Sequence, residues 1–126
     1  MTRAILDAGA LIALERGDRA MWGRLELARR SRVPLLTHGG VVAQVFRGEP
    51  RQARLAAALG AVEVAPLDDS LGRIAGRLLG KSGTSDAIDA ALVSLARDGD
   101  QLFTSDPKDI AQLAAAARIT VDVVPV

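Results

Sequence analysis

A chain of 126 residues is long enough to bury a substantial core but has room for only one domain, which we assign to residues 1–126. Its formal net charge of +1 gives no reason to expect a polyanionic partner from bulk charge, and an aromatic content of 2% excludes the stacking platform that single-strand nucleic-acid binders use. The chain has no cysteine, which excludes disulfides and thiolate metal sites and agrees with a reducing cytosol.

The first half of the chain alternates apolar runs with helical patterns. Residues 4–6 (AIL) read as a buried strand, and residues 8–17 as a short helix that ends at a glycine. Asp18 is placed to cap an amphipathic helix over residues 19–30. The pattern then predicts a strand at 34–37, a helix over 39–48, a helix over 51–60 that follows a proline, and a strand at 62–67 whose alternation suits a sheet margin.

The second half continues this alternation. Asp68 and Asp69 open a predicted helix over 70–80, and residues 81–85 (KSGTS) read as a flexible loop. The remaining elements are a helix over 86–99, a strand at 101–105, a helix over 106–118 and a closing strand at 119–126. Strands that alternate with helical segments in this way predict an α/β fold, with a parallel sheet covered by helices on both faces.

The N-terminal apolar stretch is too short and too charged to span a membrane. It contains Asp7, ends at Glu15 and Arg16, and has no small-residue cleavage site of the kind that closes a signal peptide. We therefore expect a cytoplasmic protein that does not associate with membranes.

Three aspartates stand at, or close to, the start of helical segments. Asp7 and Asp106 each follow an apolar run that reads as a strand, and Asp86 follows the Gly/Ser loop. The loops after parallel strands share one edge of the sheet, so aspartates from distant parts of the chain converge there. Clustered carboxylates repel each other unless a cation lies between them, and hard oxygen ligands select Mg²⁺ or Mn²⁺. The pattern therefore favours metal-assisted chemistry, most naturally on a phosphodiester.

Helix capping is the simpler explanation for each aspartate taken singly. Asp106 precedes Pro107 and stands three residues before Asp109, as expected for a capped helix with proline at its first position, and Asp86 and Asp89 have the same spacing. Capping and metal binding are compatible, because a helix N-terminus holds a carboxylate in a defined orientation. Capping alone does not explain why acidic residues recur on one edge of the predicted sheet.

Other polar residues give weaker signals. His38 has no Cys or Ser partner in the sequence pattern, and a surface or loop position is the simplest expectation for it. Thr104 and Ser105 adjoin an acid and are placed to orient a carboxylate, but they are also ordinary turn residues. Arg47 and Arg51 flank Gly48, where a solvated helix end is a simpler role than a contact with a phosphate backbone.

Four segments together resemble the PIN-domain family, and within it the VapC-type toxins of bacterial toxin–antitoxin pairs. These segments, in order along the chain, are LDAGALIAL with Asp7, VVAQVFRG, SDAIDAALVSLA with Asp86, and LFTSDPKDI with Asp106. The resemblance implies a three-layer α/β/α sandwich with a five-stranded parallel sheet, Mg²⁺- or Mn²⁺-dependent endoribonuclease activity, a homodimer, and a cognate antitoxin protein that blocks the site. It also implies that Asp7, Asp86 and Asp106 hold the metal.

The sequence departs from the family pattern at Gln44, which stands where most members have glutamate. Glutamine keeps an oxygen ligand but removes a negative charge, so the metal affinity is expected to be lower. Asp89, one helical turn after Asp86, is placed to restore that charge, and Asp109 is a more distant candidate. Gln44 and Asp89 are accordingly expected to act through water or as weak ligands.

Two other functional classes fit parts of this pattern. A catalytically degenerate PIN-like module that only binds a partner protein is favoured by Gln44 but not by the three retained aspartates. A receiver-type or phosphoryl-transfer domain would need a second aspartate two positions after Asp7, where this sequence has Gly9. For the dimer, we expect contacts through the apolar residues of segments 11–22 and 51–59.

Overall fold

The computed structural model describes residues 2–126 as a five-stranded, fully parallel sheet with helices on both faces. The strands lie in the order β3-β2-β1-β4-β5. Their bounds are β1 (Ala4–Leu6), β2 (Leu35–His38), β3 (Glu63–Ala65), β4 (Gln101–Thr104) and β5 (Asp122–Pro125). The helices are α1 (Ala8–Glu15), α2 (Arg19–Arg30), α3 (Gly39–Val45), α4 (Ala53–Leu59) after a short 3₁₀ turn (Pro50–Gln52), α5 (Asp69–Ser82), α6 (Ala87–Leu95) and α7 (Pro107–Ala117).

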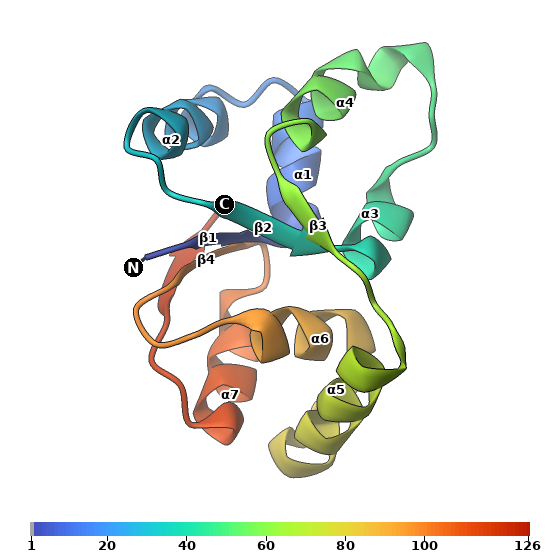
Figure 1. The fold of residues 1–126 in the computed structure, drawn as a ribbon, viewed down its shortest axis with the longest axis vertical. Helices are drawn as coiled ribbons and strands as arrows, with labels where there is room; N and C mark the ends of the chain where they lie inside the picture. Colours follow the sequence, from blue (N-terminus) through green and yellow to red (C-terminus); the bar gives the residue numbers. More distant parts are fainter. Residues whose placement is uncertain (1) are drawn as a thin grey trace.

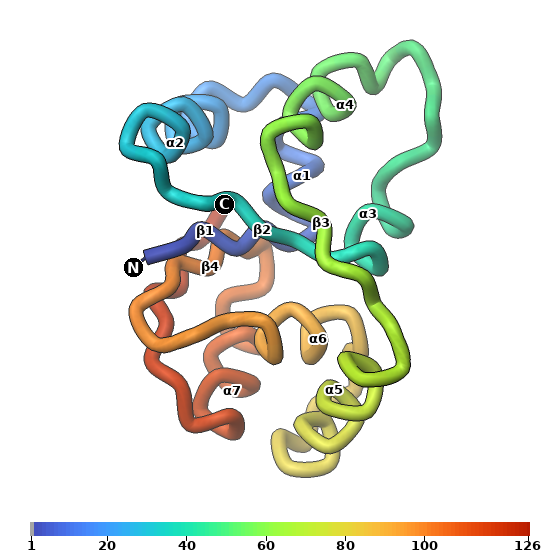
Figure 2. The backbone as a smooth tube through the Cα atoms, in the orientation of Figure 1, coloured from blue at the N-terminus to red at the C-terminus, as the bar shows by residue number. Residues whose placement is uncertain are grey.

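The helices form two layers that follow chain order. Helices α1, α2 and α4 cover one face of the sheet, with α3 at the end of that layer, and α5, α6 and α7 cover the other (Figure 1). The chain passes from the first layer to the second once, through β3 (Figure 2). The predicted α/β class, the five parallel strands and the three-layer arrangement are therefore confirmed.

The three inner strands form the centre of the core. All residues of β1 and β2 are buried, because both faces of these strands are covered by helices. The edge strands are more exposed, as the alternating sequence of β3 predicts. Within residues 2–126, no helix is long and apolar enough to cross a membrane.

Two helices end three or four residues earlier than the sequence predicts, and a side chain outside the helix explains each case. Helix α3 stops at Val45 because the buried amide of Gln52 accepts from Arg47 N at 2.7 Å and donates to Val45 O at 2.8 Å, which replaces the next helical turn. Helix α6 stops at Leu95, where the guanidinium of Arg3 donates to the Leu95 carbonyl at 2.7 Å. Arg3 is 92 positions from Leu95 and Gln52 only seven from Val45, but neither side-chain contact leaves a periodic pattern in the sequence.

Helix α5 ends later than predicted. Lys81 and Ser82 belong to its last turn, so the predicted loop over 81–85 begins at Gly83, which has the left-handed conformation typical of a helix end. At its other end, Asp68 caps α5 through a bond from Leu71 N, as expected.

The apolar segments expected to form a dimer interface are mostly inside the molecule. Leu11 and Leu14 of α1 and Leu55 of α4 are fully buried, and the buried Met21 of α2 packs into the same core. The prediction of an exposed apolar surface at 11–22 and 51–59 is therefore wrong. The prediction considered only the apolar side chains that one face of the sheet can bury. In the structure, α1 also packs against α2, α3 and α4, and these contacts bury the remaining apolar side chains. The large apolar side chains that are exposed lie elsewhere: Leu27, Phe46, Val64, Leu67, Ile74 and Val126.

Candidate active site

The candidate site lies where the strand order reverses direction. The chain builds β1, β2 and β3 toward one side of the sheet and then places β4 on the other side of β1. Asp7 follows the end of β1, and Asp106 follows β4 after one residue. In open α/β sheets, the carboxyl ends of strands at such a reversal leave a crevice for ligands. The topology thus brings together two aspartates that are 99 positions apart in the sequence.

Asp7 is held by both of its carboxylate oxygens. It is 4% exposed, and its Oδ1 accepts from Ala10 N at 2.9 Å as the cap of α1. Its Oδ2 accepts at 3.1 Å from the backbone N–H of Ser105, in the loop after β4. The expected orienting role of Ser105 is therefore played by its backbone amide. One carboxylate joins the start of α1 to the loop that carries Asp106.

The close approach of these two segments requires glycine at position 9. A Cβ added to Gly9 would lie 2.3 Å from Ser105 Oγ and 2.4 Å from Ser105 Cβ, distances that no side chain accommodates without a shift. The sequence alone does not mark Gly9 as part of the site, because a glycine in a short apolar helix has many explanations.

Asp106 is the one of the three aspartates whose side chain does not cap its helix. The carboxylate makes no capping bond to α7, and the side chain is exposed. The backbone N–H of Asp106 instead donates to the buried Thr104 Oγ1 at 2.8 Å, which fixes the turn. Capping, the simpler expectation from sequence, is thus incorrect for Asp106, whose carboxylate instead interacts with that of Asp109.

Helix α6 contributes two more carboxylates. Asp86 caps the helix, with Oδ1 accepting from Ile88 N and Asp89 N at 3.0 Å each. Burial, and after it the negative charges of Asp86, Asp7, Asp106 and Asp109 in that order, together raise the pKa of Asp89 to about 7. Asp89 is therefore close enough to all the predicted acidic ligands to interact with their charge. Among these residues, Asp109 also has a raised pKa, caused first by Asp106.

His38 is fully buried, and the expected surface or loop position is wrong. It is the last residue of β2 and the cap of α3, since its Nδ1 accepts from Gly40 N at 3.0 Å. Its Nε2 lies 2.9 Å from the carbonyl oxygen of Ile88, in the first turn of α6. The position of His38 just after an apolar run and just before a helix matches the pattern of the aspartates, and this signal was overlooked because histidine is a less common cap.

The two bonds of His38 define its protonation state. The Ile88 oxygen can only accept, so Nε2 carries the proton; Nδ1 accepts from an amide, so it has none. Burial lowers the pKa of the imidazole, which the bond to Ile88 only partly offsets. A neutral histidine therefore links the end of β2 to the helix that carries Asp86 and Asp89.

Gln44 lies on the side of α3 that faces this helix. A Cβ at Gly40 would be 2.7 Å from Ile88 Cδ1, and Gln44 is one turn further along the same face of α3. The side chain of Gln44 is exposed, and the structure shows no side-chain hydrogen bond for it within residues 2–126.

The guanidinium of Arg47 donates to the backbone carbonyl of Gln44 and also to the carbonyls of Ala43 and Phe46. Arg47 thus covers an exposed helix end, as expected.

The donor chemistry of the acidic edge fits a divalent cation, although the protein does not supply a complete cage. Within the described residues 2–126, no three His, Cys, Asp or Glu side chains stand close enough together to hold a metal ion on their own. Mg²⁺ is commonly bound through one or two carboxylates, with waters and substrate phosphates completing its shell. The Asp106 carboxylate, which does not cap α7, and the burial and repulsion that raise the pKa of Asp89 fit such a partial site.

Comparison with solved structures supports the fold of this chain. No protein-family model and no curated protein matches this sequence. Among solved structures, the chain is similar to a chain of VapBC2 from Rickettsia felis, crystallised bound to a DNA fragment from its promoter. The two share 14% identity and a TM-score of 0.68 over 97% of this chain and 98% of that one. At this level of identity, the likeness establishes that the two chains have the same fold from end to end.

Proposed function

We propose that this protein is a divalent-metal-dependent endoribonuclease and the toxin component of a type II toxin–antitoxin pair. The observation that carries the proposal is that carboxylates from three separate elements converge on one edge of the sheet. Their negative charges contribute to the raised pKa of Asp89, which is about 7. The fold shared with a chain of a VapBC complex supports it, as do the sequence motifs that resemble PIN domains.

Asp7, Asp86 and Asp106 would hold Mg²⁺ or Mn²⁺ at this edge. When bound, the cation supplies Lewis acidity toward a phosphodiester oxygen and makes a coordinated water more acidic. The protein positions Asp7 and Asp86 through backbone N–H donors, whereas the Asp106 carboxylate does not cap its helix and lies beside that of Asp109. Asp89, whose pKa lies near neutrality, is the group suited to take up or release a proton at its carboxylate.

The direct test is cleavage of RNA by purified protein. We expect cleavage to need Mg²⁺ or Mn²⁺, to stop with EDTA, and to fall by orders of magnitude in Asp7→Asn and Asp106→Asn. Asp122→Asn is the matched control, because Asp122 is an exposed aspartate at the start of β5, on the opposite edge of the sheet. Undiminished cleavage by either site variant would assign the activity to a contaminant or to another site.

The proposal includes two protein partners. The first is an antitoxin encoded next to this gene, which should copurify with the protein and suppress its RNA cleavage. The second is another copy of this chain in a two-fold dimer. A single monomer mass by light scattering at micromolar concentration would rule out the dimer.

A catalytically inactive protein-binding module is the second candidate. It is favoured by Gln44 in place of the usual glutamate and by the lack of three assembled ligands within residues 2–126. Titration of Mn²⁺ separates the two functions. An active nuclease should bind the ion at one defined site that Asp106→Asn weakens, whereas the module should show only weak binding that this substitution leaves unchanged.

A further inference from the structure

A hollow lies between α5, α6 and α7, toward the ends of α6 and α7 that are remote from the acidic edge. It has a volume of about 830 Å³ and is open to solvent. Asp86 and Asp106 stand at the N-terminal ends of α6 and α7, whereas the hollow is lined by Val93 on α6 and by Arg118 just after α7. At about 1.5 Å of rise per residue, the two regions are roughly 10 to 18 Å apart along these helices.

The floor of the hollow is apolar. Leu78 of α5 and Val93 of α6 are buried beneath it, and Ile119 contributes from the segment after α7. The space exists because α7 presents only alanines here, at positions 115–117. Ile74, at one side of the hollow, is 44% exposed. Such a floor favours an aliphatic side chain over a phosphate.

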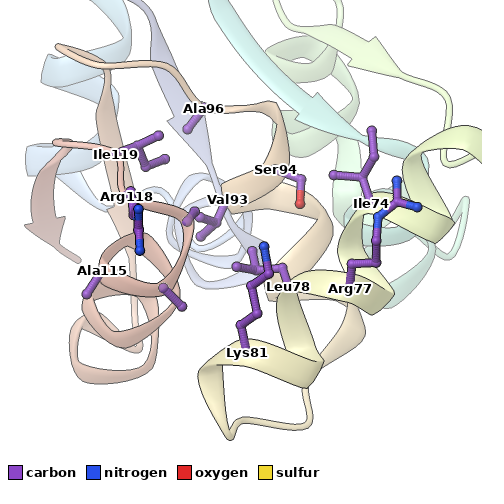
Figure 3. Close-up of a pocket in the computed structure, with 12 residues that line it drawn as sticks. Ile74, Arg77, Leu78, Lys81, Val93, Ser94, Ala96, Ala115, Arg118 and Ile119 are labelled. Carbon is purple, nitrogen blue, oxygen red and sulfur yellow. The ribbon is translucent and has the colours of Figure 1, made fainter.

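The rim of the hollow is cationic. Arg77 and Lys81 rise from α5 on one side, and Arg118 stands at the end of α7 on the other (Figure 3). No acidic residue lines the hollow, and none of these three cations is in an ion pair within residues 2–126. Lys81 and Arg118 also complement the negative ends of their helices, but Arg77 lies in the middle of α5, where this explanation does not apply.

We propose that this hollow binds an acidic amphipathic peptide segment of a partner protein. An aliphatic side chain of the segment fills the apolar floor, and carboxylates on its flanks pair with Arg77, Lys81 and Arg118. RNA fits the hollow less well, because no aromatic side chain lines it for base stacking. Since the acidic edge is at the other end of α6 and α7, a partner bound here leaves that edge open. The inference rests on the hollow alone and is independent of the proposed nuclease function.

The probe is a fluorescein-labelled 15-residue peptide of Glu, Ala and Leu, with leucines at helical spacing. Binding is followed by fluorescence anisotropy and mapped by amide chemical shifts. We expect saturable binding with shifts centred on Leu78, Val93 and Ile119, and no binding of the same peptide with Lys in place of Glu. Absence of binding at millimolar peptide, or shifts centred elsewhere, would overturn the proposal.

Two variants test the charge and the shape of the hollow separately. The double variant Arg77→Glu with Arg118→Glu should weaken peptide binding about tenfold, because it reverses the charge of two rim residues. The control Arg19→Glu with Arg30→Glu makes the same change in net charge on exposed positions of α2. Ala115→Trp should block the floor while leaving the rim charges unchanged. Equal affinity in all variants, or a 20-nucleotide single-stranded RNA that binds this hollow more tightly than the peptide, would refute the assignment.

Discussion

The Nε2 atom of His38 donates a hydrogen bond to the carbonyl oxygen of Ile88 across 2.9 Å, and this bond joins the end of β2 to the first turn of α6. Ile88 lies between Asp86 and Asp89, so the bond fixes the backbone that carries both carboxylates. The same imidazole caps α3, the helix of Gln44, through Gly40 N. One buried side chain thus sets the relative positions of two of the elements that form the acidic edge.

Replacement of His38 should therefore affect the site as well as stability. His38→Ala removes two hydrogen bonds and leaves a cavity, and we expect it to lower the free energy of unfolding by about 2 to 3 kcal/mol. His38→Asn retains an acceptor for Gly40 N but is too short to reach Ile88 O, so it should keep α3 capped while releasing the start of α6.

Amide hydrogen exchange distinguishes these two effects. In His38→Asn, the amides of residues 88–90 should exchange faster, while those of α3 stay protected. In the native protein, ring nitrogen shifts should report the neutral Nε2–H tautomer. Unchanged exchange in α6, or an imidazolium at neutral pH, would contradict the proposed linkage.

The contact between Gly9 and Ser105 provides a second prediction. Gly9→Ala forces its Cβ against Ser105, which would displace the amide that holds Asp7, and overpacking of this kind costs about 1 to 3 kcal/mol. We expect lower thermal stability and weaker RNA cleavage. Ser105→Gly in the same chain removes the clashing atoms and should restore part of both. Gly23→Ala on exposed α2, where an added Cβ meets nothing within 4 Å, is the control that should be harmless.

The raised pKa of Asp89 makes stability depend on pH. Its folded-state pKa of about 7 lies above the ordinary value of 3.8, so the folded protein binds more protons than the unfolded chain between these values. This contribution to stability is complete below the ordinary value and is lost as the pH rises through about 7.

Asp89→Asn removes this dependence. In EDTA at about pH 8, the variant should melt roughly 3 to 5 °C above the native protein, the shift that about 1 kcal/mol produces in a small domain. At about pH 4 the difference should shrink toward zero, since Asp89 in the folded protein is then protonated and as uncharged as asparagine. Calorimetric melting at the two pH values measures this. A variant that is less stable than the native protein at both would show that the carboxylate is not under repulsion.

Local patterns in this sequence predict the fold well, because the strands are short apolar runs and the helices are delimited by capping aspartates, prolines and glycines. The same patterns place Asp7 and Asp106 on one edge of the sheet, since parallel strands send their C-terminal loops there, and they predict Asp86 as the cap of α6. They do not reveal contacts between distant segments. The buried position of His38 depends on the carbonyl of Ile88, and the end of α3 depends on Gln52. Ile88 is 50 positions from His38, and Gln52, although only seven residues from Val45, is not marked as its partner by any periodicity.

Gln44 offers the sharpest test of how the acidic edge binds its cation. Gln44→Glu adds a carboxylate on the face of α3 that approaches α6, so it should tighten divalent-metal binding. Asp89→Asn removes a carboxylate next to the other acids and should weaken it. Titration calorimetry of Mn²⁺ into the native protein, the two single variants and the double variant measures both effects. The control is Glu63→Gln, an exposed acid on β3 whose loss should leave the affinity unchanged.

The double variant shows whether residues 44 and 89 act on the same ion. If they do, the two changes should partly cancel, and their sum should deviate from simple additivity, as is usual for neighbouring sites. Independent effects that add fully would place the two side chains around different ions or waters. Unchanged affinity in both single variants would remove both residues from the metal environment, and the idea that Asp89 compensates for Gln44 would be wrong.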